Sequence, residues 1–424
     1  MSMSEIYQHK NIRIHLRKRG ADQYTKTSYP LRYGVFSEIE TETAILQFNL
    51  NAEIVQARGK GRDWPSPQEW LKRTAGNDWI YYSTGGYAGV FEAIGEYYLP
   101  NTPYLTNSLI GGQPFSLPPV ARITGSWHSL LREVAEGMNG APATIRDFLD
   151  RALANSPDVL QKKAEALFGV SGGRITVLPP DARHVDYNVI PLTVAEGCLY
   201  KCRFCRVKTD SPFREKTPAE IAGQIEGLTG LYGENLANYN ALFLGEHDAL
   251  CARAELLVET VRQACAAFGF STSNMKGTSV FLFGSIDSLL QAPSRLFEDL
   301  RRLPCSFFIN IGLESADQET LDRLGKPVTV AKVAEAFARM QDINDRFLNI
   351  EVTANFIMDE GLPVNHIPSF LGLVRDKLVR TKPKGSIYLS PLRIGRPSRS
   401  ILFAFNRLKV LSRLPTFLYI IQRL

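Results

Sequence analysis

The residues best suited to chemistry lie in one short stretch, AEGCLYKCRFCRVK, which holds three of the six cysteines in 424 residues. Cys198, Cys202 and Cys205 are spaced four and then three residues apart, so that three thiols of one loop can face one centre. Thiolates bind zinc and iron–sulfur clusters. The alternative is three buried thiols on a turn, without a ligand. The spacing favours a metal or cluster site.

A zinc site and an iron–sulfur cluster make different demands on the rest of the sequence. Structural zinc usually takes four ligands from paired motifs, and the chain has no second CxxC and no HxxxH. The nearest histidines, His184 and His247, lack zinc-finger spacing. Three thiolates on a four-iron cluster would leave one iron open to a small molecule. We therefore favour a cluster with an open iron, and zinc stays open as the alternative.

The elements around this loop alternate between strand and helix patterns. Apolar runs predict six strands, followed by amphipathic segments that predict helices. Thr217, Pro218 and Glu220 have the spacing of a helix N-terminus with a capping box. Six repeats are fewer than the eight of a closed barrel, so the sheet is doubly wound or an open partial barrel. The strand segments are 187–194, 240–246, 279–286, 306–315, 347–358 and 385–392.

In either parallel architecture the chemistry lies at the carboxyl ends of the strands, and the cysteine loop follows the first of them. The stretch CLYKCRFC, with Phe204 just before the third cysteine, resembles the CxxxCxΦC signature of the radical S-adenosylmethionine (SAM) enzymes. The resemblance implies a partial (βα)6 TIM-like barrel and a 4Fe–4S cluster on the three cysteines. It also implies that the cluster cleaves SAM reductively to a 5′-deoxyadenosyl radical, which abstracts hydrogen from a substrate.

Further motifs follow the later strands in the order of that family. Gly245 and Glu246 resemble its Gly-Gly-Glu-like stretch, with one glycine missing, and the resemblance implies contact with the SAM amino group. Glu314 and Ser315 resemble an element of the subgroup with oxygen-independent coproporphyrinogen oxidase and the methylthiotransferases, which approaches the SAM ribose and methionine. Gly361 opens a Gly-hydrophobe-Pro turn that would pack on adenine, although the usual continuation is absent. Phe204 is included among the expected cofactor contacts.

The domain organisation expected from these patterns has four parts. They are an N-terminal mixed α/β accessory region at 1–125, a helical segment and linker at 126–185, the barrel at 186–392 and a basic amphipathic helical extension at 393–424. No acidic residue follows Asp376, whereas eleven Lys and Arg residues do. The extension is interpreted as a helix covering the open side of the barrel, and peripheral contact with an anionic membrane is the alternative.

Composition limits the remaining classes. The net charge is +6, with 44% hydrophobic residues, and neither a signal peptide nor a membrane-length apolar run is evident. Few cysteines in a long chain indicate a reducing, cytoplasmic location. We expect an unidentified small-molecule or lipid-like substrate, an electron donor such as flavodoxin or ferredoxin, and no nucleic acid. The rivals are a degenerate member that binds SAM without radical chemistry and a non-catalytic iron–sulfur or zinc protein for electron transfer or scaffolding.

Overall fold

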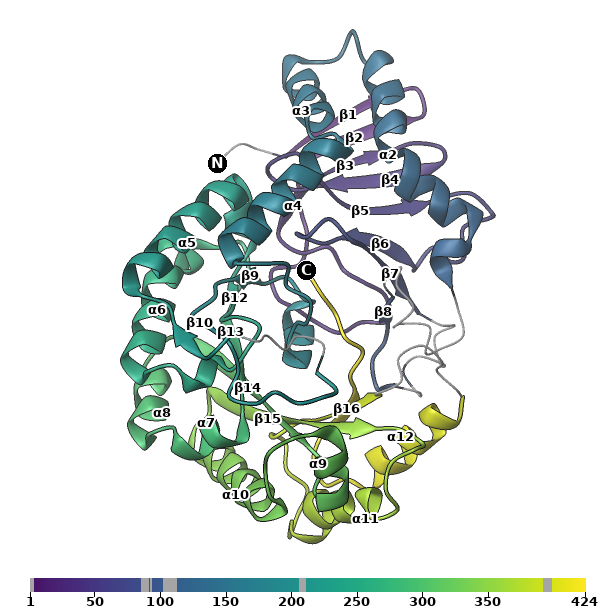
Figure 1. The fold of residues 1–424 in the computed structure, drawn as a ribbon. Coiled ribbons are helices and arrows are strands. Elements are labelled where there is room, and N and C mark those ends of the chain that lie inside the picture. Colours follow the sequence, from purple (N-terminus) through teal and green to yellow (C-terminus); the bar gives the residue numbers. More distant parts are fainter. Residues whose placement is uncertain (1–3, 85–90, 92–93, 102–112, 206–210, 392–398) are drawn as a thin grey trace.

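A computed structural model of the chain describes residues 4–84, 91, 94–101, 113–205, 211–391 and 399–424. It contains two main sheets, one antiparallel and one parallel, which follow one another in the sequence. Figure 1 shows the antiparallel sheet and its helices above the curved parallel sheet, with the C-terminus between the two. None of the described helices is long and apolar enough to cross a bilayer.

The accessory region is an eight-stranded meander in which every strand pairs antiparallel with the next one along the chain. Antiparallel neighbours of this kind need only short turns, so the whole sheet forms within 101 residues. Its strands are β1 (Glu5–His9), β2 (Ile12–Arg19), β3 (Val35–Glu40), β4 (Ala44–Phe48), β5 (Ile54–Gly59), β6 (Trp70–Arg73), β7 (Trp79–Ser83) and β8 (Leu99–Asn101).

Helices cover one face of this sheet. They are α2 (Pro118–Glu136), α3 (Ala143–Ala154) and α4 (Pro157–Ser171). Leu46 and Phe48 of the sheet share one buried cluster with Leu131 of α2 and Ile145 of α3. The helices at 118–154 therefore pack as part of the accessory domain.

The parallel sheet has seven strands in simple sequence order, which is the topology of an open barrel wound in one direction. Six of them fall on the predicted segments, and the parallel α/β class is confirmed. Their bounds are β9 (Ile190–Pro191), β12 (Ala241–Phe243), β13 (Thr278–Gly284), β14 (Cys305–Glu314), β15 (Ile350–Met358), β16 (Ile387–Pro391) and β17 (Thr416–Leu418).

Crossover helices lie on the outer side of the parallel sheet (Figure 1). The capping box of α5 is confirmed, because Thr217 N donates to Glu220 Oε2 at 2.7 Å and Glu220 N donates to Thr217 Oγ1 at 3.2 Å. The helices are α5 (Pro218–Tyr232), α6 (Ala254–Ala267), α7 (Ile286–Gln291), α8 (Ser294–Arg301), α9 (Gln318–Leu324), α10 (Val330–Arg346), α11 (His366–Leu371) and α12 (Arg399–Leu411).

The C-terminal segment continues the barrel. Phe405 and Leu408 of α12 are buried in the same core as the parallel strands, and β17 pairs with β16. The strand at 416–418 was not among the predicted six. Residues 393–398 of the predicted extension lie outside the described residues.

A 3-10 helix, η3 (Pro180–Val185), fills the inside of the parallel sheet. The carboxylate of Asp181 accepts hydrogen bonds from Thr353 Oγ1 of β15 and Tyr388 OH of β16, both at 2.7 Å. Ala182 and Val185 join a buried cluster with apolar side chains of β12 and β13. The barrel interior is therefore packed at the level of η3.

Candidate functional site

A cavity of about 260 Å³ lies at the carboxyl ends of the parallel strands. It is lined by all three cysteines of the loop and by residues from strands β13 to β16. Apolar side chains such as Phe283 and Ile357 form much of its wall. Ligand sites of α/β enzymes occur at this end of a parallel sheet.

The cysteine loop is closed at its base by a small hairpin, in which β10 (Ala195–Glu196) pairs with β11 (Arg214–Glu215). Gly197 begins the loop at φ +80°, and a Cβ there would come within 2.5 Å of the carbonyl oxygen of Pro212. Only glycine fits such a position. Arg203 N donates to the carbonyl oxygen of Leu324 at 2.9 Å, which ties the loop to the end of α9.

The three thiols have the chemistry of a cluster site. Burial raises the pKa of Cys198 and raises that of Cys202 to about 11, while the nearby Lys326 acts in the opposite direction on both. Thiolates are the metal-binding form, so a bound metal would have to reverse this shift. Within the described ranges, no three His, Cys, Asp or Glu side chains converge on one metal ion. In a four-iron cluster each cysteine binds a different iron, which does not require such convergence, and residues 206–210 after Cys205 lie outside the described part.

A bulge at the end of β14 places the next functional groups. The register with β15 shifts between Gly312 and Glu314, and Glu314 has φ +64°. Such a conformation is rare for residues other than glycine. Glu314 lines the cavity, with its Oε1 3.7 Å from Nζ of Lys326. Burial raises the pKa of Glu314, and the ammonium group of Lys326 opposes that rise.

Ser315, the neighbour of Glu314, is fully buried and takes part in a hydrogen-bond chain below the cavity. Its Oγ lies 2.8 Å from Nδ1 of His366, and Nε2 of His366 lies 3.0 Å from the carbonyl oxygen of Ile357. The carbonyl can only accept, so Nε2 carries the proton and Ser315 donates to Nδ1. Ser315 thus orders the turn after β14, where Asp317 N also donates to its hydroxyl at 3.0 Å.

Glu246 lines the cavity, but one oxygen of its carboxylate, Oε1, is engaged elsewhere. Oε1 accepts hydrogen bonds from the backbone N–H groups of Thr176 and Val177 and from the Thr176 hydroxyl. This carboxylate therefore anchors the segment before η3. Gly245 precedes it at φ +98°, a conformation that favours glycine.

Asp248 is a residue that the sequence interpretation missed. Its side chain lines the same cavity and is 3% exposed. Oδ1 accepts the backbone N–H of Ser285 at 3.0 Å, whereas Oδ2 has no hydrogen-bond partner among the described residues. Burial raises the pKa of this carboxyl group. The only sequence signal was an acid two residues after Glu246, which is common at loop starts.

Of the two remaining residues predicted to contact the cofactor, one lines the cavity and the other lies on the surface. Phe204 lines the cavity beside the thiols. Gly361 is exposed and is not among the lining residues; its carbonyl oxygen accepts a hydrogen bond from Nη1 of Arg323 at 2.6 Å. The sequence favours a solvated surface charge for Lys326, but the structure buries this residue in the cavity lining. Its Nζ lies 5.2 Å from the centre of the ring of Tyr200, which also lines the cavity and was not singled out from the sequence.

Comparison with known proteins agrees with this geometry. Residues 192–373 match the model of the Radical SAM superfamily. A probable dual-specificity RNA methyltransferase RlmN from Pelotomaculum thermopropionicum is 30% identical over 117 residues, which is 26% of this chain and 32% of that protein. Its namesake from Chlorobium luteolum is 26% identical over 230 residues, which is 46% of this chain and 62% of that protein. The chain therefore spans less than two thirds of the length of either relative.

Solved structures show only a limited likeness to this chain. A radical SAM methyltransferase from Sphaerobacter thermophilus gives a TM-score of 0.36 at 16% identity, covering 55% of this chain and 65% of that one. SuiB from Streptococcus suis also gives 0.36, at 10% identity, covering 84% of this chain and 71% of that one.

The parallel sheet, the cysteine loop after its first strand and the matched segment define a SAM-dependent iron–sulfur enzyme fold. Residues 192–373, less than half of the chain, match the Radical SAM superfamily. A radical SAM domain implies a 4Fe–4S cluster and SAM as its cofactors, and the donor set fits them: three thiols, a buried carboxylate oxygen without a partner among the described residues, and a buried ammonium group belong to residues that line one cavity.

Proposed function

We propose that the cavity at the carboxyl ends of the strands holds the cluster on Cys198, Cys202 and Cys205 with SAM beside it. The observation that carries the proposal is that these thiols share one cavity with the charged groups of Asp248, Glu314 and Lys326. When bound, the two cofactors supply one-electron chemistry that removes a hydrogen atom from a substrate.

The charged groups around the cavity suit the two ends of SAM. The free Oδ2 of Asp248 would accept from the ammonium group, because a buried carboxylate oxygen without a partner gains most from a charged donor. The carboxylate of Glu314 would accept from ribose hydroxyl groups. Burial raises the pKa of Glu314, and the ammonium group of Lys326 opposes that rise and so favours the ionised carboxylate. In this proposal Glu246 positions the loop and does not contact SAM.

Methyl transfer to RNA is the second candidate function. It is favoured by the two relatives named as probable dual-specificity RNA methyltransferases. This chain covers less than two thirds of the length of either relative, so an RNA substrate for this chain is a proposal only. The sequence itself favoured a small-molecule or lipid-like substrate, and a net charge of +6 does not decide between the two.

The experiment is anaerobic reconstitution with iron and sulfide, followed by reduction and addition of SAM. Reduction is by dithionite or by a flavodoxin or ferredoxin system, the electron donor proposed for the cell. Formation of 5′-deoxyadenosine is expected, and it should depend on Cys198. Cys198→Ala should lose iron and product together. Cys265→Ala, which removes a thiol that is not among the lining residues, is the matched control and should keep both.

The same reaction distinguishes the two functions when SAM carries a labelled methyl group. Label transferred to added RNA, together with S-adenosylhomocysteine, would favour methyl transfer. Formation of 5′-deoxyadenosine without label in RNA would favour a different substrate. A stable cluster that yields neither product, with or without RNA, would favour the rival class of non-catalytic iron–sulfur proteins.

A further inference from the structure

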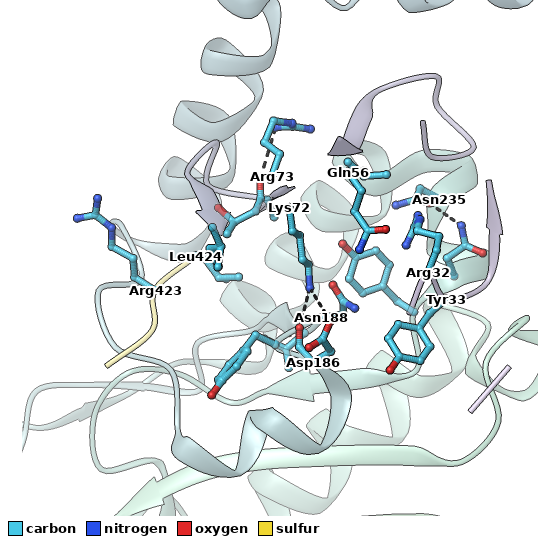
Figure 2. A pocket seen from close by; sticks show the side chains of 18 residues that line it. Arg32, Tyr33, Gln56, Lys72, Arg73, Asp186, Asn188, Asn235, Arg423 and Leu424 are labelled. Carbon is cyan, nitrogen blue, oxygen red and sulfur yellow. Dashed lines mark hydrogen bonds and ion pairs between the residues drawn. The ribbon is translucent and has the colours of Figure 1, made fainter. Parts of the chain in front are cut away.

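A second polar cavity lies at the opposite end of the barrel, between the accessory domain and the parallel sheet. Its lining comes from strands β5 and β6, from residues 186–189 just before β9, and from η4 (Gly233–Asn238) before β12. These segments precede their strands, so the cavity is at the amino ends and is separate from the cysteine site. Figure 2 shows Lys72 extending from the accessory domain toward Asp186, with Gln56 and Arg32 to one side of it in the cavity lining.

Most charges around this cavity are already paired. Lys72 Nζ donates to the carbonyl oxygen of Asp186 at 2.6 Å and lies 3.6 Å from its Oδ2. The same carboxylate accepts from the hydroxyl groups of Tyr82 and Tyr98, at 3.1 and 3.2 Å. Arg73 Nε donates to the carbonyl oxygen of Ile54 at 2.8 Å. Because these charged groups of the cavity wall already have partners in the protein, they contribute little to binding a ligand.

Arg32 is different. Its Nε is enclosed and has no hydrogen-bond partner in the described part of the chain. Arg32 is half-buried, and burial lowers the pKa of its guanidinium to about 10, so the group stays charged at neutral pH. Its Cζ lies 5.5 Å from the centre of the Phe36 ring, and the carboxylate of Asp186 acts on it electrostatically from the lining of the same cavity. That carboxylate already accepts hydrogen bonds from Tyr82 and Tyr98, so an anion in the cavity would give the guanidinium a direct partner.

Two amides complete the donor set. Gln56 is 5% exposed and lines the cavity from β5. Asn235 lines it from the barrel side, and its Oδ1 accepts from Nδ2 of Asn238 at 2.8 Å, which leaves its own amide N–H groups as donors. The volume is about 50 Å³, which is room for a few water-sized atoms and no more.

We propose that this cavity binds a small tetrahedral oxyanion of the phosphate class. Arg32 supplies the charge, and the amides of Gln56 and Asn235 donate to it from the accessory domain and from the barrel. The guanidinium fork matches such an oxyanion better than it matches chloride. The ion would join the two domains, and the proposal is independent of what the cysteine cavity does.

The test is calorimetric titration of the cluster-loaded full chain with inorganic phosphate, at constant ionic strength set by chloride. Saturable binding at one site is expected, with a phosphate-dependent rise in the thermal midpoint. Arg32→Gln should weaken binding by about tenfold or more, whereas Arg32→Lys, which keeps the charge, should lie between the two. Arg62→Gln removes the same charge from an exposed residue of the accessory domain and should bind phosphate as the wild type does.

Other outcomes would overturn the proposal. No binding of phosphate by the wild type would mean that water or the chain's own groups satisfy Arg32. Equal binding by the wild type and both Arg32 variants would place the phosphate elsewhere. Tighter binding of adenosine 5′-monophosphate than of phosphate would exclude this enclosed cavity, which has no room for a nucleoside.

Discussion

Asp248 offers the sharpest test of the cofactor site, because its replacement should separate folding from ligand binding. The carboxylate is buried, Oδ1 accepts from Ser285 N–H, and Oδ2 has no partner among the described residues. Burial raises its pKa, which means that the SAM-free fold is destabilised by keeping the group charged. Asp248→Asn is therefore expected to stabilise the SAM-free protein and to weaken SAM binding.

The magnitudes follow from that geometry. Asparagine keeps an oxygen that can accept from Ser285 and removes the buried charge, so a gain of about 1–2 kcal/mol in the free energy of unfolding is expected at neutral pH. Loss of a charged hydrogen bond to the SAM ammonium group costs about 1.5–3 kcal/mol of binding free energy. The Kd for SAM should then rise by about 10- to 100-fold.

The pH dependence of unfolding is a second test of the direction in which Asp248→Asn changes the free energy of unfolding. A folded pKa above the unfolded one stabilises the wild type at low pH, and that contribution is lost as the pH rises through the folded pKa. The stability advantage of Asp248→Asn should therefore vanish below about pH 4 and grow as the pH rises.

Two assays measure these effects. Urea unfolding of the SAM-free protein gives the stability difference, and anaerobic equilibrium dialysis of the cluster-loaded protein gives the Kd for SAM. Glu246→Gln is the matched control, since it removes a carboxylate two residues away whose oxygen already accepts from Thr176 and Val177. If Glu246→Gln weakens SAM binding and Asp248→Asn does not, the reasoning from the free oxygen is wrong and the resemblance-based assignment of Glu246 stands.

Other variants test the groups that support the barrel and the cavity. Burial raises the pKa of Asp181 to about 7, so its stabilising contribution at low pH, about 4 kcal/mol, should be lost between about pH 4 and 7, and Asp181→Asn should remove that slope from urea-unfolding data. Lys326→Met leaves the buried Glu314 without its partner and should lower the free energy of unfolding by about 3–5 kcal/mol, and adding Glu314→Gln should restore most of it; a double variant no more stable than Lys326→Met would refute the pairing. Cys202→Ala should abolish cluster reconstitution, as the iron content and visible absorbance would report, whereas retention of the full iron content would exclude Cys202 as a ligand.

Local signals in the sequence were sufficient for the barrel. The capping box at Thr217 and Glu220 needs only four residues, and the six longer apolar runs each became a strand. Strand order then followed from chain connectivity, because parallel neighbours need a crossover helix between them. The cysteine loop at the carboxyl end of β9 is a consequence of the same rule.

The parts that could not be predicted depend on distant contacts. Strand β17 lies in an apolar stretch that the sequence interpretation assigned to a helical extension, and it is a strand because it pairs with the edge of β16. The short strands β6 and β7 carry Trp and Tyr residues, which fit a loop or a core equally well, and β8 has only three residues, one of them a proline. That Oε1 of Glu246 is occupied by Thr176, a residue 70 positions earlier in the chain, is something no local motif reveals.

The two ends of the barrel differ in the charged side chains that line their cavities and in the volumes of those cavities. At the carboxyl ends, the buried acids and Lys326 face a cavity of about 260 Å³, large enough for a cofactor. At the amino ends, Arg32 faces about 50 Å³, enough only for a small ion. A folded chain retains buried charges without partners where something else completes them, because each such group otherwise costs stability. The same physical argument therefore assigns a cofactor to one end and an ion to the other, with the packed interior around η3 between them.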